Sequence, residues 1–139
     1  MRRQTRLSWL ARLTMIGLIG TGLGFVGAGI DPGPGPRAVR GSLTIDHVYL
    51  PPFLVGIVTL GIASLILTRI RWMPAVGAGF AGILLIGAGT LGAASVSYRL
   101  THPGTIGFLE DSLQLVGEAV AVVAGIAATL QSYRAERDV

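Results

Sequence analysis

Four stretches of this chain are long and apolar enough to cross a lipid bilayer, and this feature constrains the fold more than any other. Three of them, residues 13–30, 48–68 and 72–98, contain no charged residue. The fourth, residues 108–130, has acidic residues at its start and is apolar afterwards. Each is close to the length of about 20 residues with which a helix crosses a hydrocarbon core about 30 Å thick. Charged residues make up 13% of the chain, against about a quarter in soluble proteins.

Backbone amides in lipid must be bonded within their own segment, so apolar runs of this kind form α-helices. We therefore expect an all-α integral membrane protein, a four-transmembrane-helix up-down bundle that forms a single membrane domain over residues 1–139. The expected helices cover residues 10–30, 49–68, 73–98 and 106–131. Residues 31–48 form an outer loop, and its second half holds a short interfacial helix or strand. Short turns between the later helices make them antiparallel neighbours.

The arginines indicate the orientation of these helices. Eight of the eleven basic residues flank helix ends on one side of the bundle, namely Arg2, Arg3, Arg6, Arg12, Arg69, Arg71, Arg134 and Arg137. Three fall on the other side, Arg37, Arg40 and Arg99. The positive-inside rule then places both termini in the cytoplasm, in the plasma membrane of a bacterium or archaeon. One alternative stays open, in which the first apolar run is a secretory signal cleaved near Ala28.

Small residues predict where the helices pack. Gly17, Gly20, Gly24 and Gly27 lie on one face of the first helix at spacings of 3, 4 and 3 residues. The third predicted helix has small residues on two faces, Gly82 and Gly89 among them, as expected of an interior helix. Small residues allow the backbones of membrane helices to approach closely. Besides the lipid bilayer, the expected partners are further copies of the chain or a larger membrane complex. Nucleic acid is not expected, because the basic residues flank the helices.

The last predicted helix has one polar face, which we call the polar stripe. It consists of Glu110, Asp111, Gln114 and Glu118. At 100° per residue, these four positions fall within an arc of about 100°. The valines of the same helix tend to the opposite side, so we expect the polar stripe to face protein or water and the valines to face lipid.

Glu118 is the residue of the polar stripe that is the most costly to place in a membrane. It lies near the middle of the predicted helix, where an ionised carboxylate costs roughly 2.5–3.5 kcal/mol on insertion scales. Burial and neighbouring carboxylates both favour the neutral acid. Three interpretations remain: a structural hydrogen bond to Thr90, Ser95 or another helix, a site that binds a proton, cation or ligand, or a helix boundary placed wrongly.

Possible partners for the polar stripe lie at the outer face. They are Arg37, Arg40, Arg99, His47 and His102. An ion pair between an arginine and Glu110 or Asp111 is the favoured arrangement. The two histidines and the carboxylates are legitimate metal ligands, but no spacing typical of a metal site is present, so we expect no metal and no cofactor. The chain has no cysteine and no motif of a catalytic nucleophile or phosphate-binding loop.

Two functions of different classes follow. The first is a non-enzymatic accessory or self-associating helical-bundle module, in which glycine faces make the contacts. The second is a small oligomeric transporter or ion-coupling protein that uses Glu118 as its exchangeable site. The first is preferred because the sequence offers one acidic stripe and, apart from it, no second charge within the membrane with which to complete a relay. An enzyme ranks third, and no catalytic residue is assigned.

Overall fold

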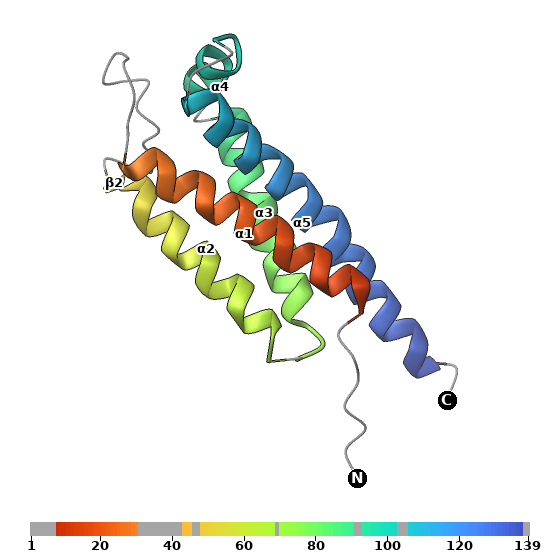
Figure 1. Ribbon diagram of the computed structural model, residues 1–139. Coiled ribbons are helices and arrows are strands. Elements are labelled where there is room, and N and C mark those ends of the chain that lie inside the picture. Colours follow the sequence, from red (N-terminus) through yellow and green to blue (C-terminus); the bar gives the residue numbers. More distant parts are fainter. Residues whose placement is uncertain are drawn as a thin grey trace.

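The computed structural model describes residues 8–30, 43–45, 48–68, 70–90, 93–102 and 106–137 of the chain. Helices account for nearly all of these residues (Figure 1). In chain order the elements are α1 (Trp9–Ile30), β1 (Leu43–Ile45), β2 (Val48–Leu50), α2 (Pro52–Ile66), α3 (Met73–Thr90), α4 (Ala93–Leu100) and α5 (Ile106–Arg137). The two strands pair antiparallel, with Leu43 opposite Leu50.

Among the described residues, three helices are long and apolar enough to cross a membrane. They cover Trp9–Gly29 in α1, Met73–Thr90 in α3 and Ile106–Arg134 in α5. The prediction of a helical membrane protein is confirmed for these three helices. Helix α2 is equally apolar but has only 15 residues, so its length alone does not make it a fourth crossing.

Helix α1 occupies the middle of the molecule. It contacts α2, α3 and α5, and Figure 1 shows α2 and α5 on either side of it. Helices α1 and α5 run antiparallel, because Gly17 lies against Gly117 while Gly24 lies against Glu110. The sequence suggested that the third apolar segment would be the interior helix, but this place belongs to α1. Helix α3 packs mainly on α5.

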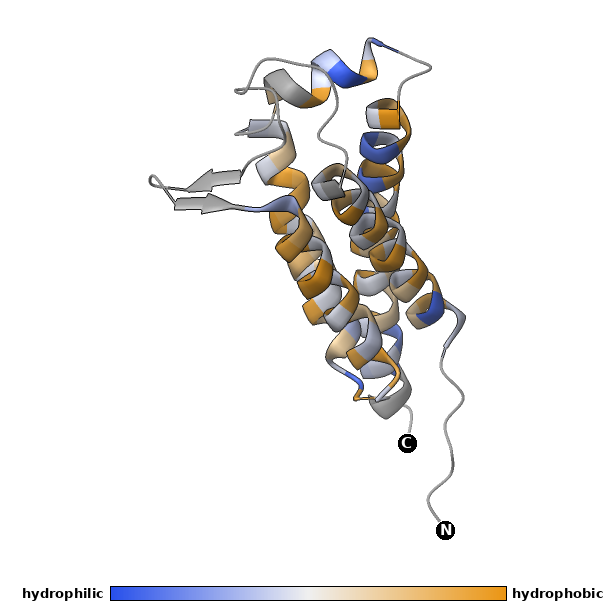
Figure 2. Ribbon diagram, turned by 60° about the vertical axis from the view of Figure 1, so that its left-hand side comes forward, coloured by the Kyte–Doolittle hydropathy of each residue, from blue (hydrophilic) through white to orange (hydrophobic). Residues whose placement is uncertain are grey.

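The segment predicted as one helix over residues 73–98 differs from the prediction. Helix α3 ends at Thr90, and α4 begins at Ala93. Helix α4 lies across the end of the bundle in place of continuing α3 (Figure 2). Its sequence, AASVSYRL, is more polar than that of α3, and from its position over the end Arg99 reaches α5. Polar side chains and this contact explain why the chain leaves the axis of α3 here.

Two other boundaries differ as well. The helix predicted from residue 49 begins at Pro52, because Val48–Leu50 form strand β2 and Pro51 is extended, with φ −60° and ψ 132°. Proline suits the first turn of a helix, where its missing amide needs no partner. Helix α5 continues to Arg137, past the predicted end at residue 131. Most of the predicted outer loop, residues 31–48, lies outside the described residues.

Small side chains fill the interior of the bundle. Its buried apolar residues include Ala11, Leu18, Ala63, Ile66, Ala81, Ala121, Ala124 and Ala128. Large apolar side chains such as Val116, Val123 and Leu130 of α5 are exposed, on the face that the sequence assigned to lipid. An inside of alanine and glycine with an outside of leucine, isoleucine and valine suits a bundle packed in lipid.

Candidate functional site

The polar stripe lies on α5, and most of it is buried. Asp111, Gln114 and Glu118 are buried, whereas Glu110 is half-buried. The three buried residues follow one another at spacings of three and four, so they form one row along the helix. The row begins near the α4 end of α5 and leads to the middle of the span Ile106–Arg134.

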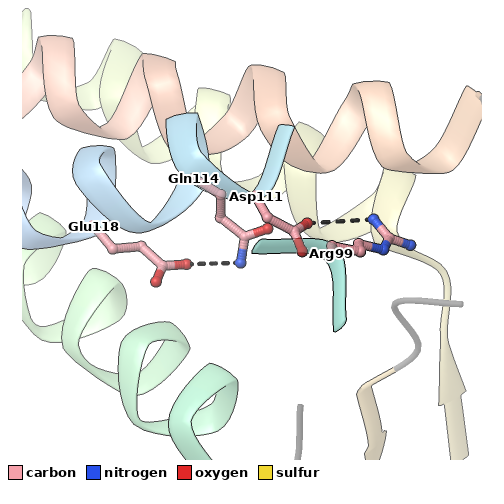
Figure 3. A network of polar contacts seen from close by, with 4 residues as sticks. All are labelled: Arg99, Asp111, Gln114 and Glu118. Carbon is pink, nitrogen blue, oxygen red and sulfur yellow. Dashed lines mark hydrogen bonds and ion pairs between the residues drawn. The ribbon is translucent and has the colours of Figure 1, made fainter. Parts of the chain in front are cut away.

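Glu118 lies at the inner end of this row. Its side chain is 0% exposed, and Gln114 Nε2 donates a hydrogen bond of 3.1 Å to its Oε1 (Figure 3). The other oxygen, Oε2, is buried and makes no hydrogen bond with the described residues. In Figure 3 the carboxyl group leaves α5 on the side where α3 passes. The hydrogen bond of Glu118 therefore lies within its own helix.

The predicted partners of Glu118 on the third apolar segment do not reach it. The hydroxyl of Thr90 is exposed and donates to the carbonyl oxygen of Ile86 at 2.8 Å. The side chain of Ser95 lies outside the described residues. Among the residues described, no hydrogen bond between Glu118 and a second helix supports the interpretation of a structural tie.

Asp111 begins the row and pairs with Arg99. The Nη1 atom of Arg99 lies 3.3 Å from Asp111 Oδ1, and the two side chains are only 10% and 9% exposed. Arg99 also lies close to Gly107, where an added Cβ would be 3.4 Å from the Cδ of the arginine. Helix α4 is thus held over the start of α5 by a buried ion pair and by the aliphatic part of the same side chain.

Glu110 is adjacent to Asp111 in the chain but faces α1. A Cβ atom on Gly27 would lie 2.7 Å from Glu110 Oε1 and 3.2 Å from its Cγ. The missing side chain of Gly27 therefore makes room for this glutamate. The four residues of the polar stripe do not act as one cluster, since Glu110 and Glu118 lie two turns apart and have different neighbours.

A threonine of α1 belongs to the surroundings of the row, although the sequence analysis did not single it out. Thr21 is fully buried, and its hydroxyl donates to the backbone carbonyl oxygen of Gln114 at 3.3 Å. Thr14, seven residues earlier, is also fully buried. Two threonines spaced two helical turns apart lie on one face of an otherwise apolar helix. This spacing could have indicated from the sequence that they face the interior.

Of the other predicted partners of the polar stripe, His102 alone belongs to the described residues. His102 is exposed, with its Nδ1 2.7 Å from the carbonyl oxygen of Tyr98 and the two rings 4.3 Å apart. Arg37, Arg40 and His47 lie outside the described residues. The described part of the chain has no group of three or more histidine, aspartate or glutamate residues that could hold a metal ion.

The six glycines predicted to pack helices differ in their contacts. Added Cβ atoms on Gly17 and Gly24 would lie 2.6 and 2.8 Å from carbonyl oxygens of α5. On Gly20 the Cβ would meet a side-chain atom of Leu113 at 3.5 Å, and on Gly82 the nearest atom, of Val122, is 3.8 Å away. Gly27 accommodates Glu110, as described above. Gly89 has no such atom within 4 Å, so it packs against no helix of the described chain.

The chemistry of this site is that of a buried carboxyl group beside an amide. Comparison of the chain with models of protein families, with curated proteins and with solved structures gave no match. A proposal for its function therefore depends on the geometry of the bundle and of the row Asp111, Gln114 and Glu118.

Proposed function

We propose that this protein is a small, non-enzymatic membrane module that crosses the bilayer four times and acts by associating with further copies of itself. The observation that carries this proposal is the direct contact between the backbones of α1 and α5. A Cβ on Gly17 would lie 2.6 Å from the carbonyl oxygen of Gly117, and a Cβ on Gly117 would lie 2.5 Å from that of Gly17. Backbones in contact leave no passage between α1 and α5, which favours a role for the surface of the module.

The outer face of α3 is the proposed surface for self-association. It combines two exposed isoleucines, Ile83 and Ile86, which are 69% and 68% exposed, with Gly79 and Gly89. An added Cβ on either glycine would meet no atom within 4 Å. The segment has small residues on two faces, and within the described chain α3 packs mainly on α5 and also contacts α1, α2 and α4. The face with Gly79, Ile83, Ile86 and Gly89 stays uncovered by these helices. A second copy of α3 would cover this face and bring the bare backbone into contact.

A pair of matched substitutions tests the self-association. Gly79→Leu places a large side chain on the proposed surface, whereas Gly61→Leu does the same on α2, where an added Cβ also meets nothing within 4 Å. Energy transfer between differently labelled copies in lipid vesicles measures the association. We expect Gly79→Leu to abolish the transfer and Gly61→Leu to leave it unchanged. Equal transfer in the wild type and Gly79→Leu would contradict the proposed surface.

The fourth crossing and the orientation are part of the same proposal. Helix α2 is apolar throughout and packs along α1, which favours a crossing despite its 15 residues. The arginine distribution favours cytoplasmic termini. Reporter fusions after Val139 and within residues 33–42 are expected to report cytoplasmic and exterior locations, respectively. Both fusions on one side would contradict four crossings, and a mature chain beginning near Gly29 would show that the first segment is a cleaved signal.

A further inference from the structure

We propose that Glu118 is a proton-exchange site inside the bundle, reached from the α4 end of α5 past Asp111 and Gln114 and closed there by Arg99. This inference goes beyond the module function and does not depend on self-association. It would serve the ion-coupling role that the sequence allows. The exchange itself is simple: the O–H bond of the Glu118 carboxylic acid breaks, and the proton passes to water that enters from the α4 end.

The first argument is that Glu118 makes no hydrogen bond to a second helix of the described chain. Its described hydrogen bond goes to Gln114 on the same helix, and its Oε2 is buried without a hydrogen bond among the described residues. Close backbone contacts, such as that of Gly125 with the carbonyl oxygen of Pro74, already join α5 to its neighbours. A buried ionisable group in a membrane segment, without a hydrogen bond to another helix, is by default a candidate for function.

The second argument is that the described residues place no counter-charge near Glu118. The described parts of α2 and α3 contain no ionisable residue, and α1 contributes only Arg12, which is exposed. Helix α4 contributes Arg99, and this arginine is paired with Asp111. On α5 itself the nearest charges are acidic, Glu110 and Asp111. A proton is the ion that balances a carboxylate in such surroundings.

A metal cation fits the site less well than a proton. Divalent cations such as Ca²⁺ take about six to eight oxygen ligands, whereas here an amide N–H already occupies Oε1 of Glu118. The described chain also offers no cluster of three metal-ligating side chains. The site holds one carboxyl group and one hydrogen-bond donor, which is sufficient for a proton.

The third argument concerns the route. Asp111, Gln114 and Glu118 form one row from the α4 end inward, so polar groups line the way at every turn. Arg99 lies over the first of them, and the ion pair with Asp111 is nearly excluded from solvent. Opening that pair admits water to Gln114 and then to Glu118. Arg99 is therefore a gating residue and not a proton carrier.

Infrared difference spectroscopy tests the site. Purified protein with ¹³C-labelled glutamate in lipid nanodiscs is compared between pH 5 and pH 9. We expect a carboxylic-acid C=O band of glutamate that changes reversibly with pH, is lost in Glu118→Gln and is retained in Glu110→Gln. The control removes a carboxyl group from the same helix two turns away. A band that persists in Glu118→Gln, or no glutamate band that changes with pH, would overturn the proposal.

The gate is tested by the rate at which the same band shifts after transfer to D₂O. We expect at least tenfold faster exchange in Arg99→Gln and no change in Arg71→Gln, which alters an arginine at the other end of the bundle. Because Arg99→Gln leaves Asp111 unpaired, the double variant Arg99→Gln/Asp111→Asn is measured too, and its folding is checked by size-exclusion elution. Exchange at the wild-type rate in the folded double variant would overturn the proposed route.

Discussion

Gly17 of α1 and Gly117 of α5 face each other so closely that a Cβ atom on either would lie within 2.6 Å of the carbonyl oxygen of the other. Real Cβ atoms essentially never approach another atom to this distance. Neither carbonyl can withdraw easily, because both belong to helical backbone. This contact fixes how deeply the two helices interlock.

The first prediction compares two glycines of α1 that are one turn apart. Gly17→Ala is expected to lower the free energy of unfolding by about 1–3 kcal/mol, the usual range for overpacking. Gly20→Ala is the matched control, because the nearest atom to its Cβ would be a side-chain atom of Leu113 at an ordinary 3.5 Å. It should be neutral or slightly stabilising. Thermal or denaturant unfolding in detergent measures both, and equal effects would show that the helices separate readily.

The second prediction concerns the buried ion pair. Arg99→Gln leaves the carboxylate of Asp111 buried and unpaired, and we expect a loss of about 3–5 kcal/mol, as is usual when one partner of a buried pair is removed. Replacing both partners, in Arg99→Met/Asp111→Leu, should restore most of that stability. Unfolding of the two variants and the wild type measures the difference. If the double variant is as unstable as the single one, the geometry of α4 rather than charge burial is what the pair maintains.

The third prediction separates Glu118 from the stability of the bundle. Replacing both partners of the hydrogen bond within α5, in Gln114→Met/Glu118→Met, should change the free energy of unfolding by less than about 1 kcal/mol, because no polar group is left unpaired. Val116→Met on the exposed face of α5 serves as the control for added methionine. A loss of several kcal/mol beyond the control would show that Glu118 does tie helices together.

The fourth prediction concerns the other end of the bundle. The guanidinium of Arg71 lies 5.6 Å from the ring centre of Tyr133, which joins the turn before α3 to the last turns of α5. Tyr133→Leu should lower stability by about 0.5–1 kcal/mol, the scale of exposed cation–π contacts. Tyr133→Phe keeps the ring and should behave like the wild type in the same unfolding assay. Equal losses in both variants would assign the effect to the hydroxyl group.

The sequence predicted the helical membrane protein because apolar runs in lipid have essentially one backbone solution. It also placed Asp111, Gln114 and Glu118 on one face of a helix, since helical spacing is local. The contact of Gly17 with α5 followed the same logic: glycines that recur on one face mark close approach. The sequence did not show which helix packs against each helix face.

The break between α3 and α4 shows this limit. Residues 73–98 form one uncharged run, so charge gives no boundary near Thr90, although the sequence of α4 is more polar than that of α3. The reason for the turn is a contact between Arg99 and Asp111, which involves a different helix. In the same way, the small residues of α3 suggested an interior helix, but α1 occupies that place. Where a helix ends and which helix is interior both depend on contacts between helices, and the sequence of a single helix does not show these contacts.

The unequal lengths of α2 and α5 have a consequence for the membrane itself. At 1.5 Å per residue, 15 residues of α2 span about 22 Å and 32 residues of α5 span about 48 Å, on either side of α1 (Figure 1). Helices packed side by side share one inclination, so the molecule cannot tilt to suit α5 without making α2 shorter still. In the four-crossing arrangement that we propose, a hydrocarbon layer about 30 Å thick would be too thick at α2, and hydrophobic mismatch would compress it there. Under that proposal the fold responds to bilayer thickness through its shortest apolar helix.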